Sequence, residues 1–161
     1  LLTANRPVPN TLQQRLDLAG GVVIDMVMTA STTIYEGSFI GYVANTGTVH
    51  PLVDQDVFAG IALEKKISDG TAGSTKIKVF HGGYFQHAVG SLAQADIGKV
   101  AFGATTGTLS DSTLNLTDTG SPAVGRVANL VSAGVGIIKM KECGYPSGSS
   151  ATPTVLTAVE G

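Results

Sequence analysis

Three histidines are the first residues whose type and spacing suggest chemistry. His81 and His87 flank the pair Gly82-Gly83, and a hairpin at this pair would bring the two imidazoles near one another. A metal site needs at least a third ligand, and this stretch contains no Asp, Glu or Cys. His50 precedes a proline, so we expect it in an extended segment. The sequence therefore favours exposed histidines at strand ends and a packing or hydrogen-bonding role for His50, with no metal site.

The next candidate is the carboxylate pair Asp54 and Asp56. A calcium loop needs further oxygen ligands and a glycine at a fixed spacing, but an apolar stretch begins at Val57 instead. The pair is more typical of a turn that forms its own Asx hydrogen bonds. A glycosidase-like pair drawn from separate strands stays open at this stage. However, carbohydrate sites use aromatic platforms, and the chain has four Tyr, five Phe and no Trp.

Nucleophile and phosphate-binding patterns are also missing from the sequence. Cys143 is the single cysteine, so no intrachain disulfide can form, and its nearest basic neighbour is Lys141. No nucleophile elbow, Walker loop or dinucleotide fingerprint occurs between a strand and a helix. The glycines at 103 and 107 belong to a loop between predicted strands. We therefore predict a protein that is not an enzyme and needs no cofactor and no metal.

The charge content is low for a water-soluble domain of 161 residues. Charged residues make up 14%, the formal net charge is −2 and the mean hydropathy is +0.26. No run approaches the roughly 20 apolar residues of a spanning helix, and residues 1–10 lack the apolar core of a signal peptide. The lysines at 65, 66, 76 and 78 are typical of a solvated strand edge, so we expect no nucleic-acid partner. A weakly charged surface of this kind indicates burial by protein partners.

Alternating apolar and polar residues predict the elements that would hold these groups. Over 75–80, Ile77 and Val79 should face inward, with Lys76 and Lys78 facing solvent. Over 22–29 both faces are mostly apolar, which predicts a strand covered on both sides. The same reasoning predicts further strands over 33–35, 39–44, 48–52, 57–64, 84–89, 100–103, 123–130 and 135–141.

Glycine-containing turns separate these strands, and helix signals are weak. We predict turns at 36–38, 45–47, 69–70, 82–83 and 106–107. One helical turn fits 91–96, ended by Gly98, and two turns fit 11–18, with Leu12 and Leu16 on one face. The predicted fold is all-β: a compact β-barrel or β-sandwich of short antiparallel strands with an extended N-terminal arm and a C-terminal tail.

The chain divides into three parts by composition. We predict an N-terminal arm over 1–19, a β domain over 20–141 and a Ser/Thr/Gly/Pro-rich tail over 142–161. A tail of this composition cannot bury enough apolar surface to order itself. We therefore expect a neighbouring subunit to hold it.

Six stretches of the chain, taken in order, resemble the bacteriophage capsid cement or decoration proteins. They are TIYEGSFIG with VFAGIALE (33–41 and 57–64), TKIKVFHGG (75–83), DIGKVAF (96–102), VGRV (124–127) and GVGII (134–138). The resemblance covers about residues 22 to 141. It implies a β-barrel-like virion protein on the outer capsid surface, made in the bacterial host cytoplasm. Such proteins form homotrimers and clamp neighbouring major capsid protein subunits of the HK97-like fold without catalysis. It implies no nucleic-acid, membrane or small-molecule partner.

The arm and the tail are the predicted contacts with the capsid or with neighbouring subunits. The residues that we select there are Arg6, Pro7, Leu12, Leu16, Tyr145, Pro146, Val155 and Leu156. The alternative function is a ligand- or glycan-binding β-sandwich domain of a phage tail fibre or receptor-binding protein. It would use the available aromatic residues, namely Tyr35, Tyr42, Tyr84 and Phe85.

Overall fold

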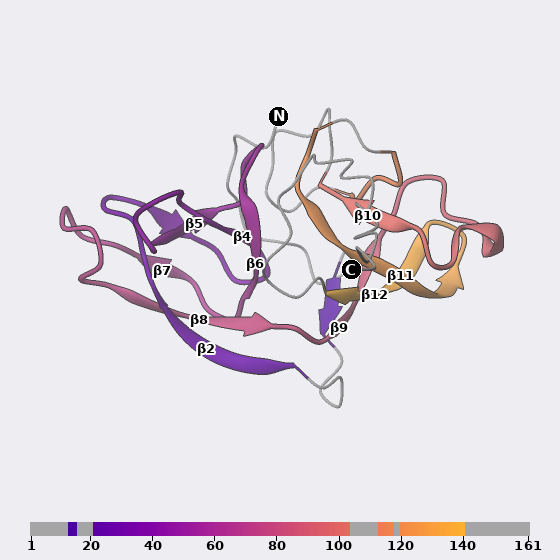
Figure 1. Ribbon diagram of the computed structural model, residues 1–161. Coiled ribbons are helices and arrows are strands. Elements are labelled where there is room, and N and C mark those ends of the chain that lie inside the picture. Colours follow the sequence, from indigo (N-terminus) through magenta and orange to yellow (C-terminus); the bar gives the residue numbers. More distant parts are fainter. Residues whose placement is uncertain (1–12, 16–20, 104–112, 118–119, 141–161) are drawn as a thin grey trace, which may run out of the picture.

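The computed structural model describes residues 13–15, 21–103, 113–117 and 120–140, and this part of the chain is all-β (Figure 1). Two five-stranded sheets and one two-stranded sheet contain its strands, and every pair of neighbouring strands is antiparallel. No helix among the described residues is long and apolar enough to cross a membrane. The predicted fold class is confirmed. Both predicted domain boundaries touch residues outside the described part and stay predictions.

The first sheet has the order β2-β8-β6-β4-β5. Its strands are β2 (Val22–Val27), β8 (Lys76–His81), β6 (Val57–Ala62), β4 (Phe39–Tyr42) and β5 (Val49–Pro51). A parallel bridge between Met28 and Val49 connects the chain just after β2 to β5, so the sheet closes on itself at that end. The two-stranded sheet of β3 (Thr33–Ile34) and β7 (Lys66–Ile67) lies beside it. The enclosed core contains Met26, Met28, Ile34, Ile40, Val49, Ala59, Ala62, Ile77 and Val79.

The second sheet has the order β1-β9-β12-β11-β10. Its strands are β1 (Gln13–Arg15), β9 (Tyr84–Ala88), β12 (Val135–Met140), β11 (Ala123–Ser132) and β10 (Val100–Phe102). The 3-10 helix η1 (Gln94–Asp96) precedes β10, where one helical turn was predicted. Here the core contains Phe85, Val89, Leu92, Ala101, Leu114, Val124, Val127, Ile138 and Met140, together with four residues from the side of the first sheet: Phe39, Leu52, Phe58 and Ile61.

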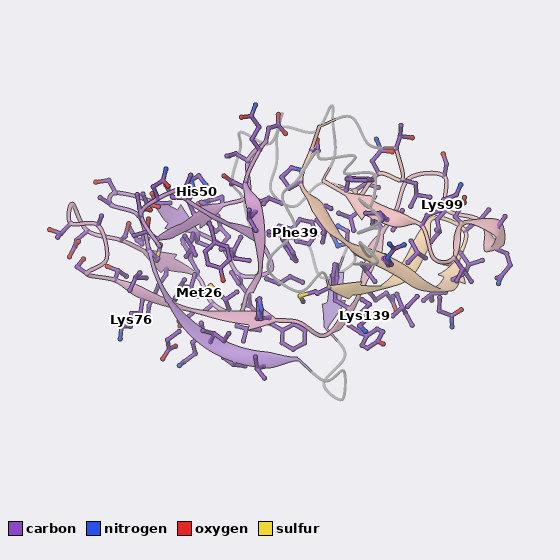
Figure 2. All side chains as sticks on the ribbon, viewed as in Figure 1. Met26, Phe39, His50, Lys76, Lys99 and Lys139 are labelled. Carbon is purple, nitrogen blue, oxygen red and sulfur yellow. The ribbon has the colours of Figure 1, made fainter. Side chains whose placement is uncertain are left out.

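Strands β4 and β6 are therefore shared between two hydrophobic cores. Phe39 points from β4 into the second core, between the two sheets (Figure 2), where its ring lies 6.0 Å from the Phe85 ring and 5.0 Å from the His87 ring. Its neighbour Ile40 faces the first core. Because successive strand residues point to opposite faces, a strand buried on both sides shows a continuous apolar run.

A bulge in β6 places two large side chains on one face. Ile40 of β4 pairs with Gly60, and the next residue of β4 pairs with Phe58, so Ala59 is the extra residue. Both Phe58 and Ile61 consequently contribute to the second core. Gly60 has φ +152, and a Cβ there would come 2.3 Å from the Phe80 carbonyl oxygen, so glycine is required.

Three predictions about these elements are wrong. The strand at 22–27 is not covered on both sides, because its first four residues are exposed; β4 and β6 have that character instead. Residues 13–15 form a strand, not part of a helix, because they pair with β9. The pair Gly82-Gly83 joins β8 of the first sheet to β9 of the second, so it is no hairpin turn. By contrast, the alternation predicted for β8 is confirmed, with Ile77 and Val79 buried and both lysines exposed.

Candidate interaction surface

The eight residues predicted to contact the capsid or neighbouring subunits all lie outside the described residues. They are Arg6, Pro7, Leu12, Leu16, Tyr145, Pro146, Val155 and Leu156. Cys143 lies outside as well. The predicted contacts therefore stay predictions. The candidate surface described below consists of exposed residues in the described part of the chain.

Three consecutive apolar side chains are exposed at the start of β2. Val22 is 55% exposed, Val23 58% and Ile24 37%, and we call these residues the β2 edge patch. Within the described residues β2 has β8 as its neighbour on one side and no strand on the other along 22–27. Figure 1 shows β2 in indigo along the lower margin of the first sheet. The patch thus combines exposed apolar side chains with a free strand edge, which is the arrangement that pairs with other chains.

Pairing with β8 and burial of Met26 hold β2, the strand that carries the patch. Every residue of β2 pairs with β8, from Val22 opposite His81 to Val27 opposite Lys76. Met26 anchors its far half in the first core. Asp25 accepts a hydrogen bond from Lys78 Nζ at 3.1 Å, but both side chains are more than half exposed, so the ion pair adds little. The ladder and the core, not the charges, position the patch.

The N-terminal end of the patch lies beside the last described residue of β12. The Phe80 ring covers Gly21 and Gly83, where any Cβ would come within 2.4 Å and 2.5 Å of ring carbons. The backbone N–H of Met140 donates to the Gly83 carbonyl at 2.8 Å. The C-terminal end of β12 therefore lies next to Gly21, the residue that precedes Val22.

Other exposed apolar residues do not gather in this way. Ile67 is 65% exposed, Val131 49% and Ile97 38%, but they lie on β7, on β11 and after η1 respectively. Single exposed apolar residues are normal on protein surfaces. Among the described residues, the β2 edge patch is the one place where three follow one another.

The lysines near the first sheet have local partners, as expected of a solvated edge. Lys65 Nζ lies 5.0 Å from the centre of the Tyr35 ring, and Lys66 Nζ lies 3.6 Å from Glu64 Oε2. Lys78 pairs with Asp25, as described above. These contacts neutralise positive charge locally on this part of the described surface.

Two histidines and one carboxylate serve the fold. His50 Nε2 and the side chain of Asp56 form a hydrogen bond of 2.8 Å, and Asp56 Oδ2 also accepts the backbone N–H of Val53 at 2.8 Å. Asp56 thus closes the local turn by reaching backward, where an Asx turn would reach forward. His81 Nδ1 donates to the Ala59 carbonyl at 2.6 Å. His50 accordingly has the hydrogen-bonding role predicted for it.

His87 differs from the prediction, because it is fully buried and not exposed at a strand end. Its ring lies against Phe39 and Phe85 in the second core. The reason is the two-residue period of β9, which directs Phe85 and His87 to the same inner face. In the described part of the chain, no three His, Cys, Asp or Glu residues gather closely enough to hold a metal ion.

Two aspartates, Asp69 and Asp96, have lowered pKa values because hydrogen bonds stabilise their ionised forms. The Ser74 hydroxyl, followed by the Thr71 backbone N–H, lowers the pKa of Asp69. Lys99 Nζ donates to Asp96 Oδ1 at 2.7 Å and is the main cause of the lowered pKa of Asp96, with the Ala93 N–H second. Asp69 lies in the loop after β7 and Asp96 ends η1, and the partners of each lie within five residues of it in the sequence, so both shifts reflect local structure.

The aromatic residues of the glycan-binding alternative do not form one platform. Phe85 is fully buried in the second core, so a ligand cannot reach it. Tyr42 packs partly buried against the first core, and the Tyr35 ring lies near Lys65. Tyr84 lies on β9 of the second sheet.

No family model and no curated protein sequence matches the chain. Among solved structures, it is similar to the head fiber gp8.5 N base in bacteriophage phi29. The two share 13% identity with a TM-score of 0.45, over 74% of this chain and 95% of that chain. A similarity at this level assigns neither a family nor a function. The resemblance to capsid cement proteins therefore stays a prediction.

Proposed function

We propose that this chain is a virion structural protein that binds the outside of an assembled phage capsid. There it stabilises the shell by clamping neighbouring major capsid protein subunits, and it acts by binding alone. The observation that carries the proposal is the β2 edge patch, because a weakly charged chain with exposed apolar residues on a free strand edge functions through contacts with other proteins. The ordered resemblance to cement proteins supports a phage shell as the partner.

The location of the resembling segments supports the same proposal. Residues 33–41 contain β3 and the start of β4, 57–64 contain β6, and 75–83 contain β8. The later segments contain β10 and parts of β11 and β12. The resemblance therefore follows the strands of both sheets and is not confined to one turn.

A binding protein of this kind stabilises a shell by mass action. It binds the assembled lattice better than free subunits, so its binding free energy is added to the stability of the assembled state. Several linked contacts around a symmetry axis raise the avidity further. We propose a homotrimer in which the arm (1–18) and the tail (144–161) contact the capsid or neighbouring copies. The pairing of β1 with β9 supports strand addition as the way in which such segments attach.

The experiment uses shells assembled from the major capsid protein encoded in the same genome. Purified full-length protein is added to undecorated shells, and occupancy is measured by sedimentation and cryo-electron microscopy. We expect saturable binding at a fixed number of copies per shell and a higher temperature of shell disruption. Absence of binding, or a position on a tail fibre of the complete virion, would contradict the proposal.

A truncation tests the contribution of the arm. Deleting residues 1–12 removes the N-terminal part of the arm but keeps β1, so β9 keeps its neighbour. We expect occupancy on shells to fall at least tenfold at a fixed protein concentration, with the far-ultraviolet circular dichroism spectrum unchanged. A truncated protein that decorates shells as well as the full chain would show that the arm makes no capsid contact.

A further inference from the structure

We propose that the apolar run at 154–159 of the tail adds as a strand along the free edge of β2 in a neighbouring copy. The proposal rests on the proposed function only in taking the protein to be a homo-oligomer. It assigns the acceptor surface for the tail, namely the β2 edge patch, and it assigns the occupant, a second copy of this chain.

The acceptor is an edge to which the described residues give none of the usual protection against pairing. Exposed edges in monomeric proteins carry lysine, proline or inward-pointing charge, or they are covered. The patch carries Val22, Val23 and Ile24, and the first charge on the strand is Asp25, which Lys78 already pairs with. An unprotected apolar edge of this kind is prone to pair with a strand of another chain.

The donor is the one stretch of the tail with strand character. Residues 154–159 read TVLTAV and follow a Ser-, Gly- and Pro-rich spacer. β-branched and apolar residues favour a strand on a half-buried surface. An added strand satisfies the free backbone groups of β2, and its side chains cover the exposed valines.

The geometry of the chain brings the donor within reach. Met140 hydrogen-bonds to Gly83, and Gly83 lies against Gly21, directly before Val22. The tail therefore departs beside the N-terminal end of the patch. Residues 141–153 can span about 45 Å when extended, at about 3.3 Å per residue. Copies that meet around a symmetry axis near these ends would each place a tail beside the next copy's β2, so every copy donates one strand and accepts one.

Disulfide trapping between two different copies tests this pairing. All variants carry Cys143→Ser, which leaves no native thiol. One copy carries Val23→Cys and a mass tag, and the other carries Val155→Cys or Leu156→Cys. The two are mixed at a concentration at which the protein is oligomeric and are then oxidised. Because Val23 is exposed, the substitution should not disturb folding.

The matched control uses Val131→Cys in place of Val23→Cys. Val131 is also a half-exposed valine, but it lies on β11 of the second sheet. We expect the disulfide between Val23→Cys and a tail cysteine to form at least tenfold faster than the one between Val131→Cys and the same tail cysteine. Equal rates would overturn the proposed surface. If both cysteines are placed in one chain, a disulfide that forms mainly at monomer mass would overturn the neighbouring copy as the occupant.

Truncation after Pro153 supplies a readout that does not depend on cysteines. We expect the amide of Val23, which points away from β8, to exchange hydrogen at least tenfold faster and the oligomer to dissociate. Protection that is unchanged by the truncation would overturn the proposal. Binding to shells is measured separately. If the cross-linked oligomers form but do not bind shells, the proposed function alone is contradicted. If the protein binds shells but the disulfide does not form, this inference alone is contradicted.

Discussion

The two five-stranded sheets differ in whether a further strand of the chain pairs with one of their outer strands, β9 in the second sheet and β2 in the first. In the second sheet, β9 would form an edge, but Gln13–Arg15 pair along it as β1. In the first sheet, β2 forms an edge and, among the described residues, no strand lies beyond it. The inner face of β9 carries Phe85 and His87, both fully buried, whereas the first three residues of β2 are exposed.

The paired edge, β9, is thus the one whose side chains form part of a buried core. β9 supports the second core, so a segment from the same chain covers it and the stability of the monomer benefits. The start of β2 contributes little to the first core, so its exposure costs the monomer little. Changes at the two edges should therefore affect different measurements: folding stability for β9 and assembly for β2.

The largest expected effect compares one side chain from each edge. Phe85→Ala should lower the free energy of unfolding by about 3–5 kcal/mol, because it removes a buried ring packed against Phe39 and leaves a cavity. Val23→Ala should change it by less than about 0.5 kcal/mol, because Val23 is exposed. Urea unfolding followed by circular dichroism measures both. Similar losses for the two variants would show that the edges are equivalent.

A smaller effect is expected when the cover of β9 is removed. Deleting residues 1–15 should cost about 1–4.5 kcal/mol more than deleting residues 1–12, since two or three backbone hydrogen bonds to β9 are lost at about 0.5–1.5 kcal/mol each. Hydrogen exchange should locate the loss at the amides of 85–87. If the two truncated proteins unfold at the same urea concentration, β1 contributes nothing to the edge.

The smallest expected effect is on the pH dependence of folding stability, and it concerns one aspartate near each sheet. Hydrogen bonds lower the pKa of Asp69 near the first sheet and of Asp96 near the second, below the ordinary value of 3.8. Folding therefore favours their ionised forms, and this stabilisation is complete above the ordinary pKa and lost as the pH falls through the lowered one. Asp69→Asn and Asp96→Asn should each flatten the acid limb of the stability curve slightly. An NMR titration that finds either carboxyl at or above its ordinary pKa would contradict this expectation.

The part of the fold that is predictable from sequence is the part in which one face of a strand is buried. The alternation of Lys76 and Lys78 with Ile77 and Val79 predicts β8 because each residue type marks one face. Residues 39–44 and 57–64 were also predicted as strands, but their burial on both faces was not. That property depends on the second sheet, which packs on them from a part of the chain more than 20 residues away.

The wrong predictions have one cause: pairing between strands that are distant in the sequence decided the structure, and the local sequence pattern did not. Residues 13–15 have a helical spacing of leucines around them, yet they pair with β9. The apolar residues of 22–24 indicated burial, but they are exposed in the single chain. The β2 edge patch could have been suspected from its position after a glycine pair and before the single charge at Asp25. Its exposure still requires the structure, because sequence does not say which strand ends a sheet.

The closing of the first sheet by the bridge between Met28 and Val49 also has a consequence for synthesis on the ribosome. All five strands of this sheet lie between residues 22 and 81, so it can fold before β9 to β12 of the second sheet are translated, as domains do from the N-terminus onward. Until residues 84–140 emerge, Phe39, Phe58 and Ile61 have no core to enter. The nascent chain then presents an apolar face on which the second half condenses, and the same face is where a chaperone would bind if translation paused.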